Sequence, residues 1–212
     1  MPALRIGLTG GIAAGKSTVA SHLVRRGAIL IDYDVLAREV VAPGSQGLEY
    51  IVERFGPKVL TASGDLDRGA LAALVFSDPQ ARADLNDITH PLIRQRARDL
   101  DAAAQPDAIT VHDVPLLAES SMAGFFDVII TVEADEETRL GRLMTTRGMT
   151  REDALARIRA QASDAQRRAI ATYVIDSTLP RDAMLTAVDE LWRELSAQSR
   201  YDDRRGEYSR DR

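Results

Sequence analysis

The first residues with an evident chemical use lie close to the amino end of the chain. Gly10 opens the run Gly-Gly-Ile-Ala-Ala-Gly-Lys-Ser, in which glycines at fixed spacing precede a lysine and a hydroxyl residue. An apolar run comes before it and a helical pattern follows, which is the strand, loop and helix context in which this spacing binds phosphate. Glycine lets successive N–H groups point inward, and the helix start adds partial positive charge. The run therefore predicts a site for nucleotide phosphates.

Each position of this loop has an expected role. Lys16 supplies a compact charge for the β- and γ-phosphates, Ser17 places its hydroxyl on Mg²⁺, and Thr18 lies near the α-phosphate. Ala13 stands where glycine is common, and we expect a right-handed backbone conformation there, which alanine tolerates. The predicted nucleotide-binding residues of the loop are Gly11, Ala13, Ala14, Gly15, Lys16, Ser17 and Thr18.

Carboxylates follow two of the expected strands. Asp32 and Asp34 come at the end of one apolar run, and Asp113 ends another. Residues just past the carboxyl ends of parallel strands line the ligand crevice. Asp34 suits a general base that takes a proton from an attacking hydroxyl, although it could also cap a helix that starts near Val35. Asp32 fits the catalytic role and the capping role about equally. Asp113 suits a residue held toward Mg²⁺ through water.

Arginine far outnumbers acidic residues between Arg139 and Arg168 in an otherwise acidic chain. Guanidinium groups that close over a phosphate site stabilise the charge that spreads over a transferring phosphoryl group. Arg142 and Arg147 lead into this segment and are the best candidates. Arg157 and Arg159 are read as an ordinary solvated helix face.

Apolar runs at residues 4–9, 28–32, 108–113, 127–132 and 173–176 alternate with helix-length segments. Such alternation requires crossover connections, so it predicts an α/β fold with a three-layer, doubly wound, parallel five-stranded sheet. The segment between the second and third strands is too long for one crossover, and helical patterns at 48–55, 69–76, 79–88 and 91–100 predict a helical insertion there. The last helix follows Pro180 and carries an apolar stripe that ends at Leu195.

These patterns divide the chain into four parts. We expect a phosphate-binding core at residues 1–40, 106–141 and 169–196, a helical insertion at 41–105 and a small helical, arginine-rich segment at 142–168. The charged residues 197–212 have almost no aliphatic content, so we expect them to be disordered.

Composition excludes several classes of function. The formal net charge is -5 and the pI is near 5.3, so the chain offers no field that would recruit nucleic acid or an anionic membrane. Cysteine is absent, which rules out disulfides and thiolate chemistry. No apolar run approaches a membrane span, and the first residues do not read as a signal peptide. We expect a cytoplasmic protein that is a monomer or a weak homo-oligomer.

Taken together, the motifs resemble those of the dephospho-coenzyme A kinase family along roughly Leu4 to Trp192. The matching segments begin with Leu8-Thr-Gly-Gly-Ile and its loop, and continue with Ile31-Asp-Tyr-Asp-Val-Leu-Ala-Arg38, His90-Pro-Leu-Ile93, Asp113-Val-Pro-Leu-Leu-Ala-Glu119, Arg147-Gly-Met-Thr150 and Arg157-Ile-Arg-Ala-Gln161. This family uses ATP to phosphorylate the ribose 3′-hydroxyl of dephospho-coenzyme A, the last step of coenzyme A synthesis.

The resemblance implies that the insertion at 41–105 binds the acceptor and that residues 142–168 form a lid. It also implies roles for individual residues. Asp34 would be the general base, Lys16 and Arg142 would stabilise the γ-phosphate, and Arg147 would act from the lid. The acceptor site would be lined by Asp32, Asp34, His90, Arg94, Leu116, Leu117 and Glu119. Family members usually carry aspartate and asparagine where this chain has Thr172 and Ser177, two positions expected near the adenine end of the ATP site.

Four alternative functions fit the motifs less well. A GTPase switch would need an Asn-Lys-x-Asp motif, and the chain has none. Shikimate kinases also carry paired aspartates after the second strand, but a glycine-rich segment usually follows their third strand, where this chain has Val114-Pro-Leu-Leu117; adenylate kinases also differ there. A non-catalytic nucleotide-binding module would leave Asp34, Asp113 and the arginines without a shared purpose.

Overall fold

The computed structural model describes residues 4–210, and it describes side chains as far as residue 198. The chain forms two compact units: residues up to Ile31 together with those from Ala104 onward make the first, and Asp32–Ala103 make the second.

A five-stranded sheet with the order β2-β3-β1-β4-β5 forms the centre of the first unit. Its strands are β1 (Leu4–Gly10), β2 (Ile29–Asp32), β3 (Ile109–Asp113), β4 (Val128–Glu133) and β5 (Tyr173–Asp176). β1 pairs in parallel with β3 and β4, and β4 pairs in parallel with β5. The carboxyl ends of the strands therefore meet at one edge. The sequence prediction of an α/β fold on a parallel five-stranded sheet is confirmed.

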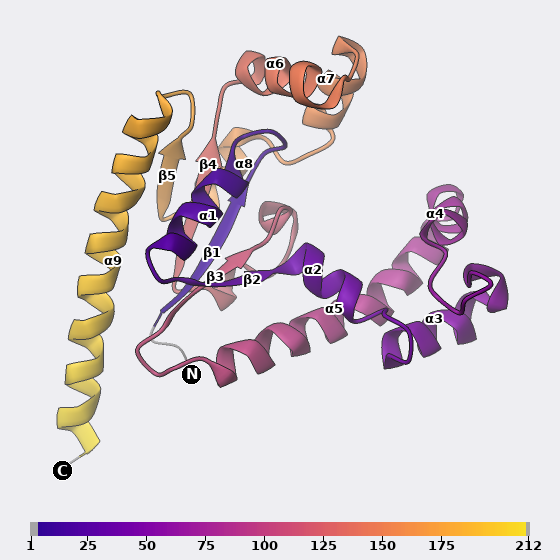
Figure 1. The fold of residues 1–212 in the computed structure, drawn as a ribbon, viewed down its shortest axis with the longest axis horizontal. Helices are drawn as coiled ribbons and strands as arrows, with labels where there is room; N and C mark the ends of the chain where they lie inside the picture. The colour runs from indigo at the N-terminus through magenta and orange to yellow at the C-terminus, as the bar shows by residue number, and fades with distance from the viewer. Residues whose placement is uncertain (1–3, 211–212) are drawn as a thin grey trace. The chain divides into compact units, whose positions relative to one another are not determined.

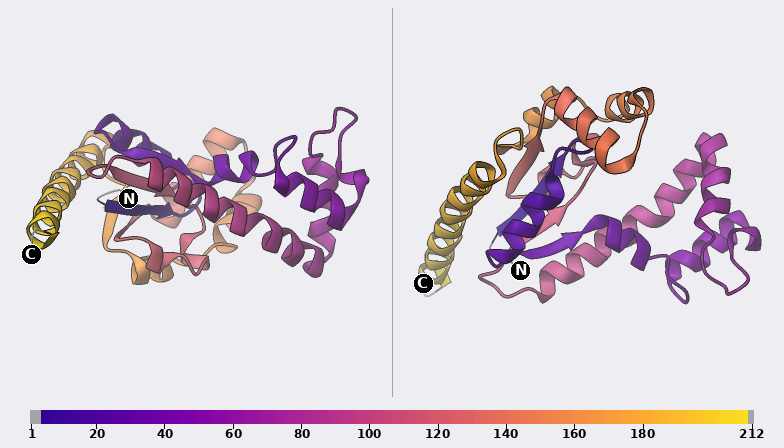
Figure 2. Two further views of the ribbon diagram at one scale, coloured as in Figure 1. Left: turned by 90° about the horizontal axis from the view of Figure 1, so that it is seen from below. Right: turned by 45° about the horizontal axis from the view of Figure 1, so that its top comes forward.

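The helices of the first unit are α1 (Lys16–Arg25), α6 (Glu136–Arg147), α7 (Arg151–Arg159), α8 (Asp164–Ile170) and α9 (Arg181–Arg210). α1 packs on β1, β3 and α9, while α8 packs on β4. In Figures 1 and 2, α9 runs beside β5, with which it is in contact. The core between these elements is aliphatic, and the stripe on α9 contributes Met184, Val188, Leu191 and Leu195, all buried as predicted.

The second unit is helical. It contains α2 (Tyr33–Glu39), α3 (Gln46–Phe55), α4 (Arg68–Ser77) and α5 (Pro79–Ala103), with a short 3₁₀ turn at Pro57–Val59. α5 packs against each of the other three helices (Figure 1). The core of this unit includes Ile51, Phe55 and Leu71.

Two expectations about helices were wrong. Residues 79–88 and 91–100 were read as separate helices, yet α5 is continuous through Pro91. Proline removes one backbone hydrogen bond, but α5 packs against three other helices along its length, and that packing outweighs the loss. The tail expected to be disordered is helical as far as Arg210. Extending an existing helix needs no new nucleus, and arginine and glutamate favour helix. Residues 211–212 lie outside the described part of the chain.

Among the described residues, no helix combines the length and apolar character that a membrane span requires.

Candidate active site

The phosphate-binding loop joins β1 to α1 with two left-handed residues. Gly15 has φ of 92° and Ala13 has φ of 61°. The expectation that position 13 is right-handed was therefore wrong: alternating right- and left-handed residues turn successive N–H groups to the same side, and this loop requires the turn at residue 13. A left-handed alanine costs about 1–2 kcal/mol. Its side chain packs against the apolar cluster of Leu140, Leu143 and Ile158, which offsets part of that cost.

Lys16 and Asp113 lie together at the carboxyl edge of the sheet. Asp113 ends β3, where its backbone pairs with Leu8 of β1 just before the loop. The Lys16 ammonium forms an ion pair with the Asp113 carboxylate, and both side chains are largely buried. Ser17 follows Lys16 and is exposed at the start of α1. The structure thus gathers a cation, a carboxylate and a hydroxyl at one end of the loop, as the sequence predicted.

Arg142 of α6 donates hydrogen bonds to the phosphate loop and to Ser177. Its Nη1 donates to the carbonyl oxygen of Ala13 at 3.1 Å and to the hydroxyl of Ser177 at 3.0 Å, and its Nη2 donates to the carbonyl oxygen of Ser177 at 2.6 Å. The Ser177 hydroxyl in turn donates to the carbonyl oxygen of Ala14 at 2.5 Å. Ser177 is 5% exposed, so these bonds are shielded from water. Together they fix the loop's backbone.

A cavity of about 600 Å³ opens beside this network, a size that accommodates a nucleoside. The loop contributes Ala13, Gly15, Ser17 and Thr18 to its wall. The rest of the wall includes Arg142, Thr146, Arg147, Ser177, Leu179, Arg181 and Met184. Arg147 is the last residue of α6 and is exposed. The cavity thus brings the loop, both candidate arginines and Ser177 into one site.

The expectation that Thr172 lies near the adenine end was wrong. Thr172 precedes β5, whereas Ser177 follows it, so the two residues lie at opposite ends of the strand. The Thr172 hydroxyl accepts a hydrogen bond from the N–H of Ile129 at 3.1 Å, and its own N–H donates to the carbonyl of Ile129 at 2.8 Å. Its side chain extends the pairing of β4 with β5, a structural role.

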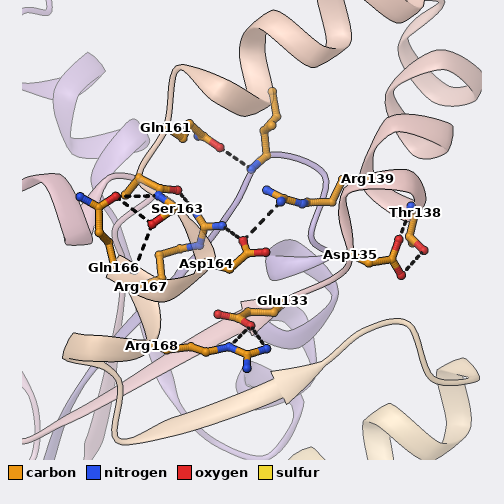
Figure 3. Close-up of polar contacts among 12 residues, drawn as sticks. Glu133, Asp135, Thr138, Arg139, Gln161, Ser163, Asp164, Gln166, Arg167 and Arg168 are labelled. Atoms are coloured by element: carbon orange, nitrogen blue, oxygen red, sulfur yellow. Dashed lines mark hydrogen bonds and ion pairs between the residues drawn. The ribbon is translucent and has the colours of Figure 1, made fainter.

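Two arginines that the sequence reading did not single out lie against the loop. Arg139 and Arg167 are buried, and both approach Gly11. Figure 3 shows both side chains bonded to Asp164. Arg139 lies one helical turn before Arg142 on α6, so its spacing was a usable signal. Arg167 was visible only as one of many arginines, because no local pattern indicates that it is buried.

The two leucines that follow β3, Leu116 and Leu117, differ in burial. Leu116 is 52% exposed, whereas Leu117 is fully buried and packs near Gly7 of β1. The Leu117 side chain therefore has no surface to offer an acceptor, and that expectation was wrong: the 3₁₀ turn at Leu117–Glu119 directs it into the core. Glu119 accepts a hydrogen bond from the N–H of Ala162 at 2.7 Å, so it anchors the segment between α7 and α8.

The remaining candidates belong to the second unit. Asp32 caps α2, since its carboxylate accepts from the N–H groups of Asp34 at 2.8 Å and Val35 at 3.1 Å. Capping thus falls to Asp32, which leaves Asp34 exposed in the first turn. His90 and Arg94 lie one turn apart on α5, and both are exposed.

Tyr33, between Asp32 and Asp34, is buried, and charged side chains surround it. Burial and the nearby Asp101 raise the pKa of the Tyr33 hydroxyl far above its usual value, and Arg94 and Arg98 oppose this shift. The packing of α2 on α5 therefore brings two arginines close to the Asp-Tyr-Asp segment.

Comparison with known proteins decides the family. The family model described as dephospho-CoA kinase matches residues 4–180 of the chain. The chain belongs to the dephospho-CoA kinase family. That family catalyses the last step of coenzyme A biosynthesis.

Individual members of the dephospho-CoA kinase family agree with this placement. A dephospho-CoA kinase of Streptomyces avermitilis is 50% identical over 192 residues, which cover 91% of this chain and 94% of the relative. One from Mycolicibacterium paratuberculosis is 49% identical over 90% of this chain, but the match spans only 47% of that longer relative. The solved dephospho-CoA kinase of Campylobacter jejuni has the same fold, with a TM-score of 0.69 at 24% identity, covering 93% of this chain and 99% of that one. The GTPase, shikimate kinase and adenylate kinase readings are thereby set aside.

Proposed function

We propose that this chain transfers the γ-phosphate of ATP to the ribose 3′-hydroxyl of dephospho-CoA, giving CoA and ADP. The observation that carries the proposal is the nucleoside-sized cavity that continues from the phosphate loop, in a chain whose family performs this reaction. The cavity accounts for the nucleoside of ATP, and the loop accounts for its phosphates.

The reaction requires one proton transfer and one phosphoryl transfer. The 3′-oxygen attacks the γ-phosphorus, the bond from that phosphorus to the β,γ-bridging oxygen breaks, and its electron pair leaves with ADP. Asp34 is the proposed acceptor of the hydroxyl proton, and its exposed carboxylate is available for this role. Lys16 is the proposed partner of the γ-phosphate. This assignment requires the Lys16 ammonium either to contact the phosphates and Asp113 at once or to break its ion pair with Asp113.

Arg142 is better placed to hold the loop than to reach the γ-phosphate, because both of its Nη atoms donate to backbone or hydroxyl oxygens. We therefore assign Arg142 to loop positioning and to the cavity wall. Arg147, exposed at the end of α6 and on the same wall, is the proposed nucleotide contact from the lid at 142–168.

The residues near the loop suit Mg²⁺. This ion prefers oxygen ligands and is usually held by one or two protein oxygens, substrate phosphates and water. Ser17 offers a hydroxyl and Asp113 a carboxylate, and both adjoin Lys16, one in sequence and one by ion pair. Bound Mg²⁺ would neutralise charge on the β- and γ-phosphates.

The acceptor carries phosphate groups of its own, and the second unit has side chains to match. His90, Arg94 and the neighbouring Arg98 are exposed on α5. We assign these residues, with Asp32 as the cap that fixes Asp34, to the acceptor site. A cytoplasmic location, a monomeric or weakly homo-oligomeric state and the lack of nucleic acid partners remain predictions.

The test is a coupled assay of ADP release with dephospho-CoA, shikimate or AMP as acceptor, with CoA identified by mass spectrometry. We expect turnover with dephospho-CoA alone. ADP release at the acceptor-free rate would refute the proposal.

The role of Asp34 is tested by Asp34→Asn, which should lower turnover on the order of 10²- to 10⁴-fold with little change in ATP binding. Glu53→Gln removes an exposed carboxylate of α3 in the same unit and is the matched control. If Asp34→Asn keeps full turnover, Asp34 is not the base.

A further inference from the structure

Two buried guanidinium groups face the first residues of the phosphate loop. A Cβ atom added at Gly11 would lie 2.5 Å from Nη1 of Arg139 and 3.1 Å from Nη2 of Arg167. The side chains of Arg139 and Arg167 are only 5% and 4% exposed. A larger residue at position 11 would therefore displace the guanidinium group of Arg139. This steric constraint differs from the left-handed turn that Gly15 provides.

One carboxylate holds both groups in place. Oδ1 of Asp164 accepts from Nη2 of Arg139 at 3.3 Å and also from Nη2 of Arg167 (Figure 3). Nη1 of Arg167 donates to the carbonyl of Ala162. Within the described part of the chain, Nε and Nη1 of Arg139 and Nε of Arg167 are buried and have no hydrogen-bond partner.

The charges of this cluster do not balance. Two buried cations share one carboxylate. The buried Glu133 is bonded through Oε2 to Arg168 at 2.7 Å, and its Oε1 is buried with no hydrogen-bond partner among the described residues. Buried charges without compensation, and buried donors without acceptors, are costly. An anion with several oxygens, bound beside Gly11, would satisfy the remaining donors. A guanidinium group suits phosphate because its donors form a planar fork that matches the spacing of the phosphate oxygens.

The position of the two arginines along the loop indicates which phosphate of the nucleotide they would contact. The nucleoside-sized cavity borders the loop from Ala13 to Thr18, whereas the arginines lie at Gly11, the other end of the loop. A polyphosphate that starts in the cavity and follows the loop brings its last phosphate toward Gly11. The arginine pair thus lies where the terminal phosphate ends.

We propose that Arg139 and Arg167 form a binding site for the γ-phosphate of the bound nucleoside triphosphate, and that Asp164 is a positioning residue that holds both guanidinium groups toward it. The inference deepens the proposed function at its ATP site and rests on it for the identity of the nucleotide.

Hydrogen bonds fix the segment that carries Asp164 and Arg167 to the phosphate loop. Oε1 of Gln161 accepts from the N–H of Ile12 at 2.7 Å, and Glu119 accepts from the N–H of Ala162. Ser163 and Gln166 form a reciprocal capping box at the start of α8. The arginine pair is therefore preorganised, which lowers the entropic cost of binding the phosphate.

The test compares nucleotides that differ only in the γ-phosphate. Calorimetry would measure the dissociation constants of ADP and of a non-hydrolysable ATP analogue for the full chain and for Arg139→Met, Arg167→Met and Asp164→Asn, with no acceptor present. Each arginine variant should weaken the analogue about tenfold or more, as for the loss of a charged hydrogen bond, and change ADP less than about twofold. Asp164→Asn should lower the ratio of the affinity for the ATP analogue to the affinity for ADP, and Asp164→Glu should restore part of this ratio. Arg159→Met, on the exposed face of α7, is the matched control.

An equal loss for both nucleotides, or no loss for either, would overturn the inference. Arg139→Lys and Arg167→Lys keep the charge, and they replace the Met variants if thermal unfolding shows that those do not fold; a lysine lacks the guanidinium fork, so the ratio should still fall. The outcome is separate from that of the proposed function. A lowered ratio without CoA formation would refute only the acceptor, while CoA formation with an unchanged ratio would refute only the arginine site.

Discussion

Removing the Ser177 hydroxyl gives the sharpest test of how the loop is held. Ser177→Ala deletes the bond to the carbonyl of Ala14 and one of the bonds from Arg142, while the two other Arg142 bonds survive. One neutral and one charge-assisted hydrogen bond at a buried site together contribute about 2–3 kcal/mol. For a chain of this length that corresponds to a decrease of roughly 4–12 °C in the thermal midpoint. The KM for ATP should rise several-fold, because the loop loses an anchor.

Differential scanning calorimetry and initial-rate kinetics would measure the two effects. Thr178→Ala is the matched control, since Thr178 is the exposed neighbour and its hydroxyl donates to the carboxylate of Asp176. It should change the midpoint by no more than an ordinary surface substitution. If Ser177→Ala behaves like Thr178→Ala in both measurements, the network does not hold the loop.

Two further predictions rest on single contacts, and a third rests on the proposed metal role. Gly11→Ala would place a Cβ 2.5 Å from Nη1 of Arg139, so nucleotide affinity should fall at least tenfold while circular dichroism stays unchanged; wild-type affinity would contradict the close approach. Arg26, and then His22, hold the pKa of the Asp189 carboxyl at about 2. A folded-state pKa below the ordinary value of about 4 stabilises the chain above that pH and loses the effect as pH falls. Asp189→Asn should therefore lower the thermal midpoint at neutral pH and flatten its decrease between about pH 4 and pH 2; an unchanged acid profile would contradict the ion pair. Chelation of Mg²⁺ should abolish phosphoryl transfer but leave ADP binding measurable by calorimetry, and full turnover in excess chelator would exclude the proposed metal role.

Much of the fold follows from local pattern. The strands Leu4–Gly10 and Tyr173–Asp176 were identified because a buried parallel strand reads as a short apolar run between helix-length segments. The cap of α7 is local as well, because the N–H of Asp153 donates to the hydroxyl of Thr150 three residues before it. The continuity of α5 through Pro91 was not readable, since packing against distant helices decides it.

The sequence by itself determined the phosphate site, because a loop that binds phosphate with its own backbone needs glycines, a lysine and a hydroxyl at fixed spacing in one short segment. It also determined the family, through several motifs of that kind. Only the tertiary structure decided what the arginines do. Whether a guanidinium faces water or lies buried against Gly11 depends on segments far apart in the chain, so Arg167 could not be distinguished from the solvated Arg157 and Arg159 before α8 and the loop were brought together. The same holds for Ser177, a single hydroxyl at the end of β5, which acquires its role from Ala14 and Arg142.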